Sequence, residues 1–457
     1  MIQTLLQKKY LLYILAFIIV QPVIDVLTTF SIYVLEIDVT FGVIIRVAFM
    51  VLMGVLLLLF AMKSKQAKLF VVYLIGLAIM IVINIYLNTS TKDPYYLFDE
   101  LKFFNKVVYF HVVFLGFLLV YEELTRLKVD VEKKTTSYLF YSGVIIGLVF
   151  ILAQITGTSL ANYASYKKGF SGWFFAGNEI GAIMAMVLPI VALYAIERTA
   201  NAKKPWFWIP FVMLSMGMLA LGTKVGYGGI LVVLLSVAIG SLIIWFWKKE
   251  ATKKVKSNFV VSVSLIVLLA VATPFTPVFS NMYAHLDLLN IDFGGEDAPG
   301  EVEPEDEEPV ITEEEFQNLV FSSREKYVKE FAQDFNQAPT TQKIFGMGFA
   351  GNYDEKELGK DLKMIEMDFY DLFYSFGWLG FIYLMTPFFY YAVRIIVKFV
   401  KNLKEYFTYE YMLYGVALLL GLGIAYTAGH VFTAPAVSIY LAMLLAFMNR
   451  WTPTIKL

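Results

Sequence analysis

Residues 43–62 read VIIRVAFMVLMGVLLLLFAM, a run in which Arg46 is the only ionisable side chain. A helix of about 20 residues rises about 30 Å, which is the thickness of the hydrocarbon core of a bilayer. This stretch therefore predicts a membrane-spanning helix centred near residue 52. Eleven other windows are similarly apolar, centred near residues 20, 78, 114, 147, 186, 214, 237, 269, 382, 418 and 440.

The composition of the whole chain agrees with this pattern. Hydrophobic residues make up 59% of the 457 residues, charged residues make up 16%, and the mean hydropathy is +0.66. Soluble proteins are about 25% charged. We therefore predict an all-α polytopic integral membrane protein with about 12 transmembrane helices. The first window lacks a small-residue cleavage pattern, so we expect a retained helix and not a signal peptide.

The distribution of Lys and Arg predicts the orientation of the helices. Connections on the side of the N-terminus hold most of the 37 Lys and Arg residues, among them Lys8, Lys9, Lys63 and the five lysines from Lys248 to Lys256. Cytoplasmic loops are enriched in Lys and Arg. We therefore expect a multi-pass protein of the plasma membrane with both termini in the cytoplasm.

One long polar segment interrupts the succession of apolar windows. It divides the chain into helices 1–9 (residues 1–280), an extracytoplasmic loop (residues 281–368) and helices 10–12 (residues 369–457). Residues 294–315 are acidic and too poor in apolar residues to fold, which predicts a disordered tether. Residues 316–368 begin with apolar residues at helical spacing, which predicts an amphipathic helix. A tight turn is predicted after this helix by Gly346, Gly348 and Gly351.

The sequence argues against several classes of site and partner. The chain has no cysteine, which excludes disulfides and thiolate metal sites. Its three histidines, His111, His285 and His430, are too few for a cluster of histidine ligands. The formal net charge of −1 argues against a nucleic-acid partner. We expect neither a metal nor another cofactor.

Ionisable residues inside the apolar windows indicate a functional site, because such a side chain at the bilayer centre costs about 2.5–3.5 kcal/mol. Asp25 lies late in the first window and Arg46 early in the second, at matching depths, which predicts an ion pair that is either structural or functional. Four more lie at the predicted outer ends of helices: Glu179, Lys224, Asp368 and His430. Together they predict an outward-facing polar cavity whose cations suit an anionic group, above all a diphosphate.

Four stretches resemble the O-antigen ligase and polymerase superfamily. KKGFSGWFFAGNEIGAIMAMVLPIVALY (residues 167–194) is similar to its Gly-Phe-x-Gly motif, which is followed by an Asn, here Asn178, and a long apolar helix with Pro. LALGTKVGYGGILVVLL (residues 219–235) resembles its Thr-Ser-Arg segment, with Lys224 in the basic position. SSREKYVKEFAQDFNQAPTTQKIFGMGFAG (residues 322–351) resembles its outer-loop Arg and the Gly-rich turn after it, and DFYDLFYSFGWLGFIYLM (residues 368–385) resembles the next helix. The resemblance covers about residues 138–449.

This resemblance implies a GT-C-type membrane glycosyltransferase. Such an enzyme moves glycan from a polyprenyl-diphosphate carrier onto a glycan or lipid acceptor at the outer face, without a metal or a nucleotide sugar. The chain agrees with the last point, since it has no Asp-x-Asp motif of a metal-dependent nucleotide-sugar site. Other envelope-assembly proteins are expected as further partners.

One departure from the family leaves the general base open. Ligases of lipopolysaccharide usually carry a His-Asn pair where this chain has Glu366, Met367 and Asp368. The base is then Asp368, with Glu366 as second choice, or His430, because an imidazole suits a general base. Since the chain also lacks cysteine and is rich in lysine, the departure favours a polymerase or ligase of a Gram-positive surface glycan.

The mechanism implied by the resemblance places cations at the departing diphosphate. Arg324 and Lys224 are expected to stabilise the negative charge that develops there, with Arg46 behind them. Attack from the opposite face would invert the anomeric centre. Supporting roles are expected for Asp25, Asn178 and Glu179.

Each main candidate also has a purely structural reading. Arg324 fits a solvated helix face, Lys224 an interfacial anchor, and His430 an interhelical hydrogen bond. A twelve-span flippase of lipid-linked oligosaccharide is the alternative function, although the two corresponding halves of a transporter are not evident in the sequence. A glycan-binding scaffold is a third class.

Overall fold

The computed structural model of the chain describes residues 2–93, 95–163, 167–199, 205–250, 252–287, 324–350 and 365–452. These residues form α-helices joined mostly by short connections. Within them, the only β-type pairing is an antiparallel bridge between Ala161 and Phe170. The chain is therefore an all-α polytopic membrane protein, as its sequence predicts.

Ten of the described helices are long and apolar enough to span a bilayer. They are α1 (Ile2–Tyr33), α2 (Phe41–Ala61), α3 (Lys65–Thr91), α4 (Leu97–Arg126), α5 (Val131–Ile155), α6 (Gly177–Arg198), α8 (Lys224–Phe246), α9 (Lys253–Ala272), α15 (Asp368–Lys401) and α17 (Tyr409–Thr427).

Two of the twelve predicted windows fall on shorter apolar helices. One comprises η1 (Pro205–Trp208) and α7 (Ile209–Ala220), and the other is α18 (Pro435–Arg450). The 16 residues of α18 rise only about 24 Å, less than the hydrocarbon core. Every residue from Ala436 to Asn449 is buried in protein. Because α18 does not face lipid along its length, it does not need to reach both interfaces.

Side-chain caps explain where several helices begin. Thr40, Ser64, Asp130, Thr223 and Thr252 each precede a helix, and each side chain accepts a hydrogen bond from a backbone N–H in the first turn. Such caps satisfy donors that have no partner within the helix. Short polar residues between apolar runs therefore set these boundaries locally.

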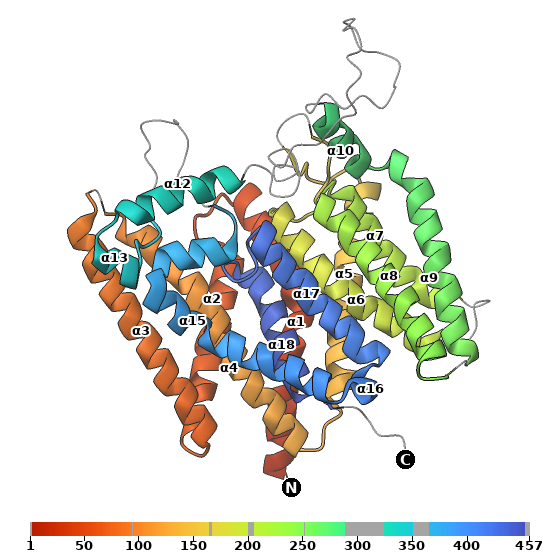
Figure 1. Ribbon diagram of the computed structural model, residues 1–457, viewed down its shortest axis with the longest axis horizontal. Helices are drawn as coiled ribbons and strands as arrows, with labels where there is room; N and C mark the ends of the chain where they lie inside the picture. The colour runs from red at the N-terminus through yellow and green to blue at the C-terminus, as the bar shows by residue number, and fades with distance from the viewer. Residues whose placement is uncertain are drawn as a thin grey trace, which may run out of the picture.

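The most buried helices, α4, α6 and α18, form the middle of the bundle, whereas α3 and α9 lie at opposite edges (Figure 1). The N-terminal end of α1 and the C-terminal end of α18 lie on one face, which we call the terminal face. The opposite face carries α10 (Pro277–Asp287), α12 (Arg324–Gln337) and α13 (Thr340–Phe345), and we call it the loop face (Figure 1). α12 lies in the region where the sequence predicts an amphipathic helix; residues 316–323 of that prediction, the acidic tract 294–315 and Gly351 lie outside the described residues.

Helix α15 is broken at Gly377, which has φ 65° and ψ −175°. The segment that follows α13 enters the break: the N–H of Met347 donates to the carbonyl of Tyr374 at 2.9 Å, and that of Gly348 to the carbonyl of Ser375 at 3.1 Å. Gly346 has φ 99°, and a Cβ there would collide with the backbone of Ser375. Irregular backbone at membrane depth requires protein partners, and this turn supplies them.

Polar side chains of α3 secure the turn from the other side. The Nδ2 of Asn84 donates to the carbonyls of Phe345 at 2.6 Å and Ser375 at 2.8 Å. The Nδ2 of Asn88 donates to the carbonyl of Gly346 at 3.1 Å, and its Oδ1 accepts from Gln342 at 2.9 Å. Asn84 and Asn88 are one helical turn apart and wholly buried, so both face the turn.

A buried carboxylate holds the end of the same turn. Glu100 accepts from the N–H of Phe349 at 2.8 Å and of Ala350 at 3.2 Å, and lies 3.5 Å from the Nζ of Lys92. Lys92 lies between α3 and α4, where burial lowers its pKa to about 8, although the charge of Glu100 acts in the opposite direction. The loop after α12 is thus fixed to the bundle by contacts with α3, α4 and α15.

Candidate functional site

A polar cavity of about 210 Å³ opens at the loop-face ends of α1, α2 and α6. Its polar lining comes from Asp25, Thr28, Thr40, Arg46 and Glu179, and its remaining walls are mainly apolar. Ligand sites in proteins are concave and combine mainly apolar walls with a few convergent polar groups. We call this the central cavity.

The ion pair predicted from the depths of Asp25 and Arg46 is present. The Nη2 of Arg46 donates to the Oδ1 of Asp25, and its Nε donates to the Oε1 of Gln21 at 3.1 Å. Arg46 is only 7% exposed. A buried charge needs a hydrogen-bonded partner of opposite sign, so this pair neutralises Arg46 on one side of the cavity.

Glu179 lies in the first turn of α6, where a negative charge is favoured by the helix dipole. The charges of Asp25, His430, Arg46 and Lys106 all act on its carboxylate. His430 lies in the connection between α17 and α18, so the fold brings together two segments that are more than 200 residues apart in the chain. The preceding residue, Asn178, is exposed.

Asp368 is completely buried and accepts four hydrogen bonds. The donors are the N–H groups of His430 at 3.1 Å, Val431 at 2.7 Å and Phe432 at 2.9 Å, and the hydroxyl of Thr433 at 2.7 Å. A carboxylate has about four lone-pair positions, and here all are used. Asp368 therefore holds the segment between α17 and α18 and has no lone pair left for a substrate proton.

Asp371, one turn later in α15, holds the segment that precedes α15. Its carboxylate accepts from the N–H groups of Ile365 and Met367, both at 3.1 Å. Two aspartates in the first turn of one helix thus position two loops. The Asp-x-x-Asp spacing in the sequence is a signal for this, since residues three apart share a helix face.

Glu366 and His430 have an unusual backbone conformation, each with φ 61°. They are also adjacent, because the Cα of Gly429 contacts the backbone of Glu366 so closely that a Cβ there would collide with it. Residues other than glycine rarely adopt positive φ, and such strain is concentrated at functional sites. The loops before α15 and before α18 therefore meet in a strained pair of turns, and neither Glu366 nor His430 lines the central cavity itself.

Arg324 is paired with Glu366. Its Nη2 lies 2.7 Å from the Oε2 of Glu366, and the two side chains are 16% and 28% exposed. The first residue of α12 is thus attached to the strained turn that also contacts Gly429. Arg324, Glu366, His430 and Asp368 therefore form a continuous chain of contacts, which the sequence motifs predicted only as separate candidates.

Lys224 does not line the central cavity but belongs to a cluster of lysines at the start of α8. The charge of Lys167 acts on it. Asn281 of α10 ties the neighbouring backbone together, because its Nδ2 donates to the carbonyls of Lys168 at 2.7 Å and Gly222 at 2.8 Å. We call Lys167, Lys168 and Lys224 the lysine cluster.

An apolar groove continues from the lysine cluster. Lys167 and Lys168 line a cavity of about 420 Å³. It shares Phe170 and residues 275–277 with a second, mostly apolar cavity of about 500 Å³ between α5 and α7. Ile155 and Met216 in the second cavity are 77% and 57% exposed, so it is open to lipid.

Sequence analysis missed Gln21, Asn84, Asn88, Glu100 and Asp371. All five are polar residues within or beside apolar windows, which is the signal that could have identified them. Their partners are backbone groups or side chains far along the chain, so their roles require the folded structure.

Comparison with known families gives a match over most of the chain. The profile described as O-antigen ligase like membrane protein matches residues 7–449. The match includes the central cavity, the strained turns and the lysine cluster. A search of curated proteins found no match to this chain.

Proposed function

The chain belongs to the O-antigen ligase-like membrane protein family, and on this basis we propose that it transfers glycan from a polyprenyl-diphosphate carrier to an acceptor hydroxyl at the outer face of the cell membrane. The family itself indicates a multi-pass membrane enzyme of glycosyltransferase type that ligates or polymerises surface glycans. The loop face is then the outer face, and both termini are cytoplasmic, in accordance with the distribution of Lys and Arg.

The observation that carries the proposal is the position of His430. Its backbone N–H donates to Asp368, the residue before it contacts the backbone of Glu366, and its charge acts on Glu179, which lines the central cavity. An imidazole titrates close to neutral pH and suits a general base. Of the three candidate bases, Asp368 has used its lone pairs and Glu366 is paired with Arg324, so we assign the base to His430.

The leaving group requires cations where negative charge develops. Arg324 and Lys224 fill this role in the proposal, with Arg46 behind them. The structure adds Lys167 and Lys168 beside Lys224, and the apolar groove next to them has the character needed for the isoprenoid chain. Ammonium groups act as mobile point charges on phosphate oxygens, and Arg324 offers a rigid fork.

The reaction itself is a displacement. The acceptor oxygen forms a bond to the anomeric carbon, the bond from that carbon to the diphosphate oxygen breaks, and the acceptor proton passes to His430. The products are the new glycoside and the polyprenyl diphosphate. Attack from the face opposite the diphosphate inverts the anomeric configuration, and no metal is needed in this scheme because cationic side chains carry the counter-charge.

The broken helix α15 bears on the alternative of a flippase. Broken helices in transporters expose backbone groups that bind the substrate. At Gly377 the freed carbonyls of Tyr374 and Ser375 accept hydrogen bonds from Met347, Gly348 and Asn84. This break is thus filled by protein, which favours a fixed enzyme site over a moving substrate gate.

The test uses purified protein in liposomes with a polyprenyl-diphosphate oligosaccharide. We expect a new glycosidic product, and we expect His430→Ala to reduce the rate about 100-fold or more, within the range that general bases contribute. His285→Ala in α10 is the matched control and should retain activity. Leaflet exchange of the carrier without product would support the flippase, and binding without either would support a scaffold.

A further inference from the structure

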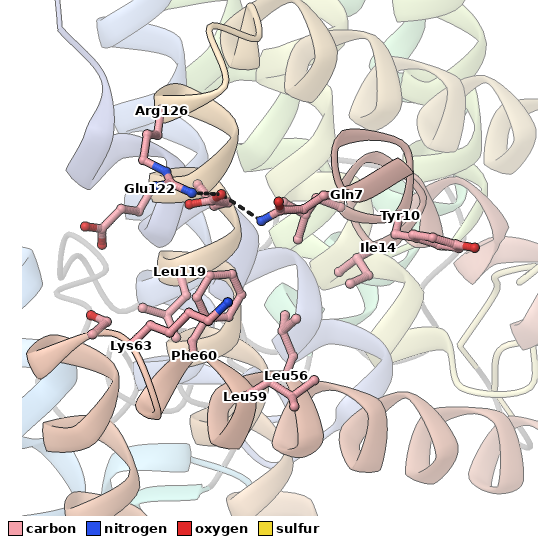
Figure 2. Close-up of a pocket in the computed structure, with 13 residues that line it drawn as sticks. Gln7, Tyr10, Ile14, Leu56, Leu59, Phe60, Lys63, Leu119, Glu122 and Arg126 are labelled. Atoms are coloured by element: carbon pink, nitrogen blue, oxygen red, sulfur yellow. Dashed lines mark hydrogen bonds and ion pairs between the residues drawn. The ribbon is translucent and has the colours of Figure 1, made fainter. Parts of the chain in front are cut away.

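Another cavity lies at the terminal face, at the opposite end of the bundle from the central cavity. Its volume is about 510 Å³, and it lies between α1, the end of α2 and the end of α4 (Figure 2). Its apolar walls are Leu11, Ile14, Leu56, Leu59, Phe60 and Leu119. Tyr10 and Leu59 are 63% and 53% exposed, so the cavity opens sideways toward the bilayer.

The two carboxylates in the lining are neutralised by neighbours. Glu123 is only 6% exposed; its Oε1 accepts from Gln7 at 2.8 Å and from Arg126 at 2.5 Å (Figure 2). The Oε2 of Glu122 lies 2.6 Å from the Nη2 of Arg450. The acidic groups therefore do not give the cavity a net negative character.

Lys63 is the cation that remains for a ligand. It follows α2, and its side chain extends over Phe60 and Leu119 into the cavity (Figure 2). Within the described part of the chain, Lys63 forms no ion pair. Lys65 and Lys68 are exposed nearby and add positive charge outside the cavity. The cavity thus combines an apolar interior, a lateral opening and a positive mouth.

We propose that this cavity binds an anionic phospholipid from the leaflet at the terminal face, with the phosphate against Lys63 and an acyl chain along Leu56, Leu59 and Ile14. Basic pockets between transmembrane helices at the positively charged side of a membrane protein select anionic head groups. Lys63 is complementary in charge to the phosphate, and the apolar walls are complementary to an acyl chain, so the cavity matches both parts of such a lipid. The bound lipid would lie against α1, α2 and α4 at once.

The test measures lipid retention and thermal stability of the full-length protein purified in detergent. The probes are phosphatidylglycerol, phosphatidylcholine and glycerol 1-phosphate. We expect native mass spectrometry to show retained phosphatidylglycerol but little phosphatidylcholine, and the unfolding midpoint to rise only with phosphatidylglycerol. Lys63→Glu should weaken this retention about tenfold or more, since it converts an attractive charge into a repulsive one.

Lys65→Glu is the matched control, because it makes the same charge change two residues away on a side chain that does not line the cavity. It should weaken phosphatidylglycerol retention much less than Lys63→Glu does, because Lys65 adds charge only outside the cavity. Equal losses in the two variants, or equal retention of both phospholipids, would overturn the proposal. A stabilising effect of glycerol 1-phosphate alone would also overturn it, since that result indicates a simple anion site.

A second variant covers the case in which Lys63→Glu does not fold. Leu59→Trp places a bulky side chain at the partly exposed apolar wall and should displace the acyl chain without changing charge. Its elution volume and its unfolding midpoint without lipid report whether it is folded. A folded Leu59→Trp protein that still retains phosphatidylglycerol fully would exclude the cavity as the binding site.

Discussion

Asp368→Asn distinguishes a structural carboxylate from a catalytic base. The native carboxylate accepts four hydrogen bonds, two at each oxygen. An asparagine side chain keeps one acceptor oxygen, while its amide nitrogen is a donor and faces two other donors. At least two hydrogen bonds are therefore lost. Hydrogen bonds to charged groups contribute about 1.5–3 kcal/mol each to stability. The free energy of unfolding should therefore fall by about 3–6 kcal/mol.

This loss should appear as instability and as inactivity together. We expect the unfolding midpoint of Asp368→Asn in detergent to fall clearly, and the rate of glycan transfer to fall because the turn of His430 is no longer held. Thr433→Val removes only one of the four hydrogen bonds and should give a smaller decrease in both. Asp99→Asn is the control: its side chain is 39% exposed and pairs with the exposed Lys102, so its removal should change stability very little.

The two explanations give different results for Asp368→Asn. If Asp368 were the general base, the substitution would abolish transfer and leave the unfolding midpoint close to that of the unmodified protein. That result would refute the structural role derived from the four hydrogen bonds. It would also move the base assignment from His430 back to Asp368.

Three further predictions concern other parts of the molecule. Arg324→Ala should lower the transfer rate about 100-fold or more in a protein that still inserts. Arg324→Lys should restore the rate only in part. Near-normal transfer by Arg324→Ala would contradict the proposed role of Arg324 at the diphosphate. Single cysteines placed at the exposed Lys253 and at Asp306 of this cysteine-free chain should react with an impermeant reagent from opposite sides of intact cells. Equal reaction at both would contradict the proposed topology. Lys92 should titrate at about pH 8 in the folded protein, well below an ordinary lysine, as measured by NMR after ¹³C-methylation. Because the unfolded chain still binds that proton, the contribution of Lys92 to stability should rise as the pH increases from about 8 to about 10.5. Glu100→Gln should lower the pKa of Lys92 further, since it removes the negative charge that favours the protonated form, and an unchanged pKa would contradict the pairing.

Much of the fold could be predicted because membrane insertion is governed by local hydropathy. All twelve predicted windows fall on helices, and ten have spanning length. The two shorter ones could not be distinguished, because an apolar helix buried inside a bundle and one exposed to lipid have similar composition. The pairing of Asp25 with Arg46 could be predicted too, since adjacent spans and a fixed rise per residue leave little choice of depth.

The roles within the site depended on contacts that span the chain. The sequence left the base open between Asp368, with Glu366 as second choice, and His430. Only the folded structure shows that Asp368 is enclosed by four donors from residues 430–433. Likewise, the family resemblance grouped Lys224 with Arg324, whereas in the folded chain the charge of Lys167 acts on Lys224.

The sequence by itself determined the class of protein, its helical spans and its family, because these follow from hydropathy, charge and short motifs that act over a few residues to one helix length. Tertiary structure alone decided which polar groups are already satisfied. Asn84 meets Ser375 across 291 positions and Asp368 meets Val431 across 63. The availability of a lone pair or a charge depends on such distant partners, and in a low-dielectric interior that availability decides whether a side chain positions a loop or is free to react.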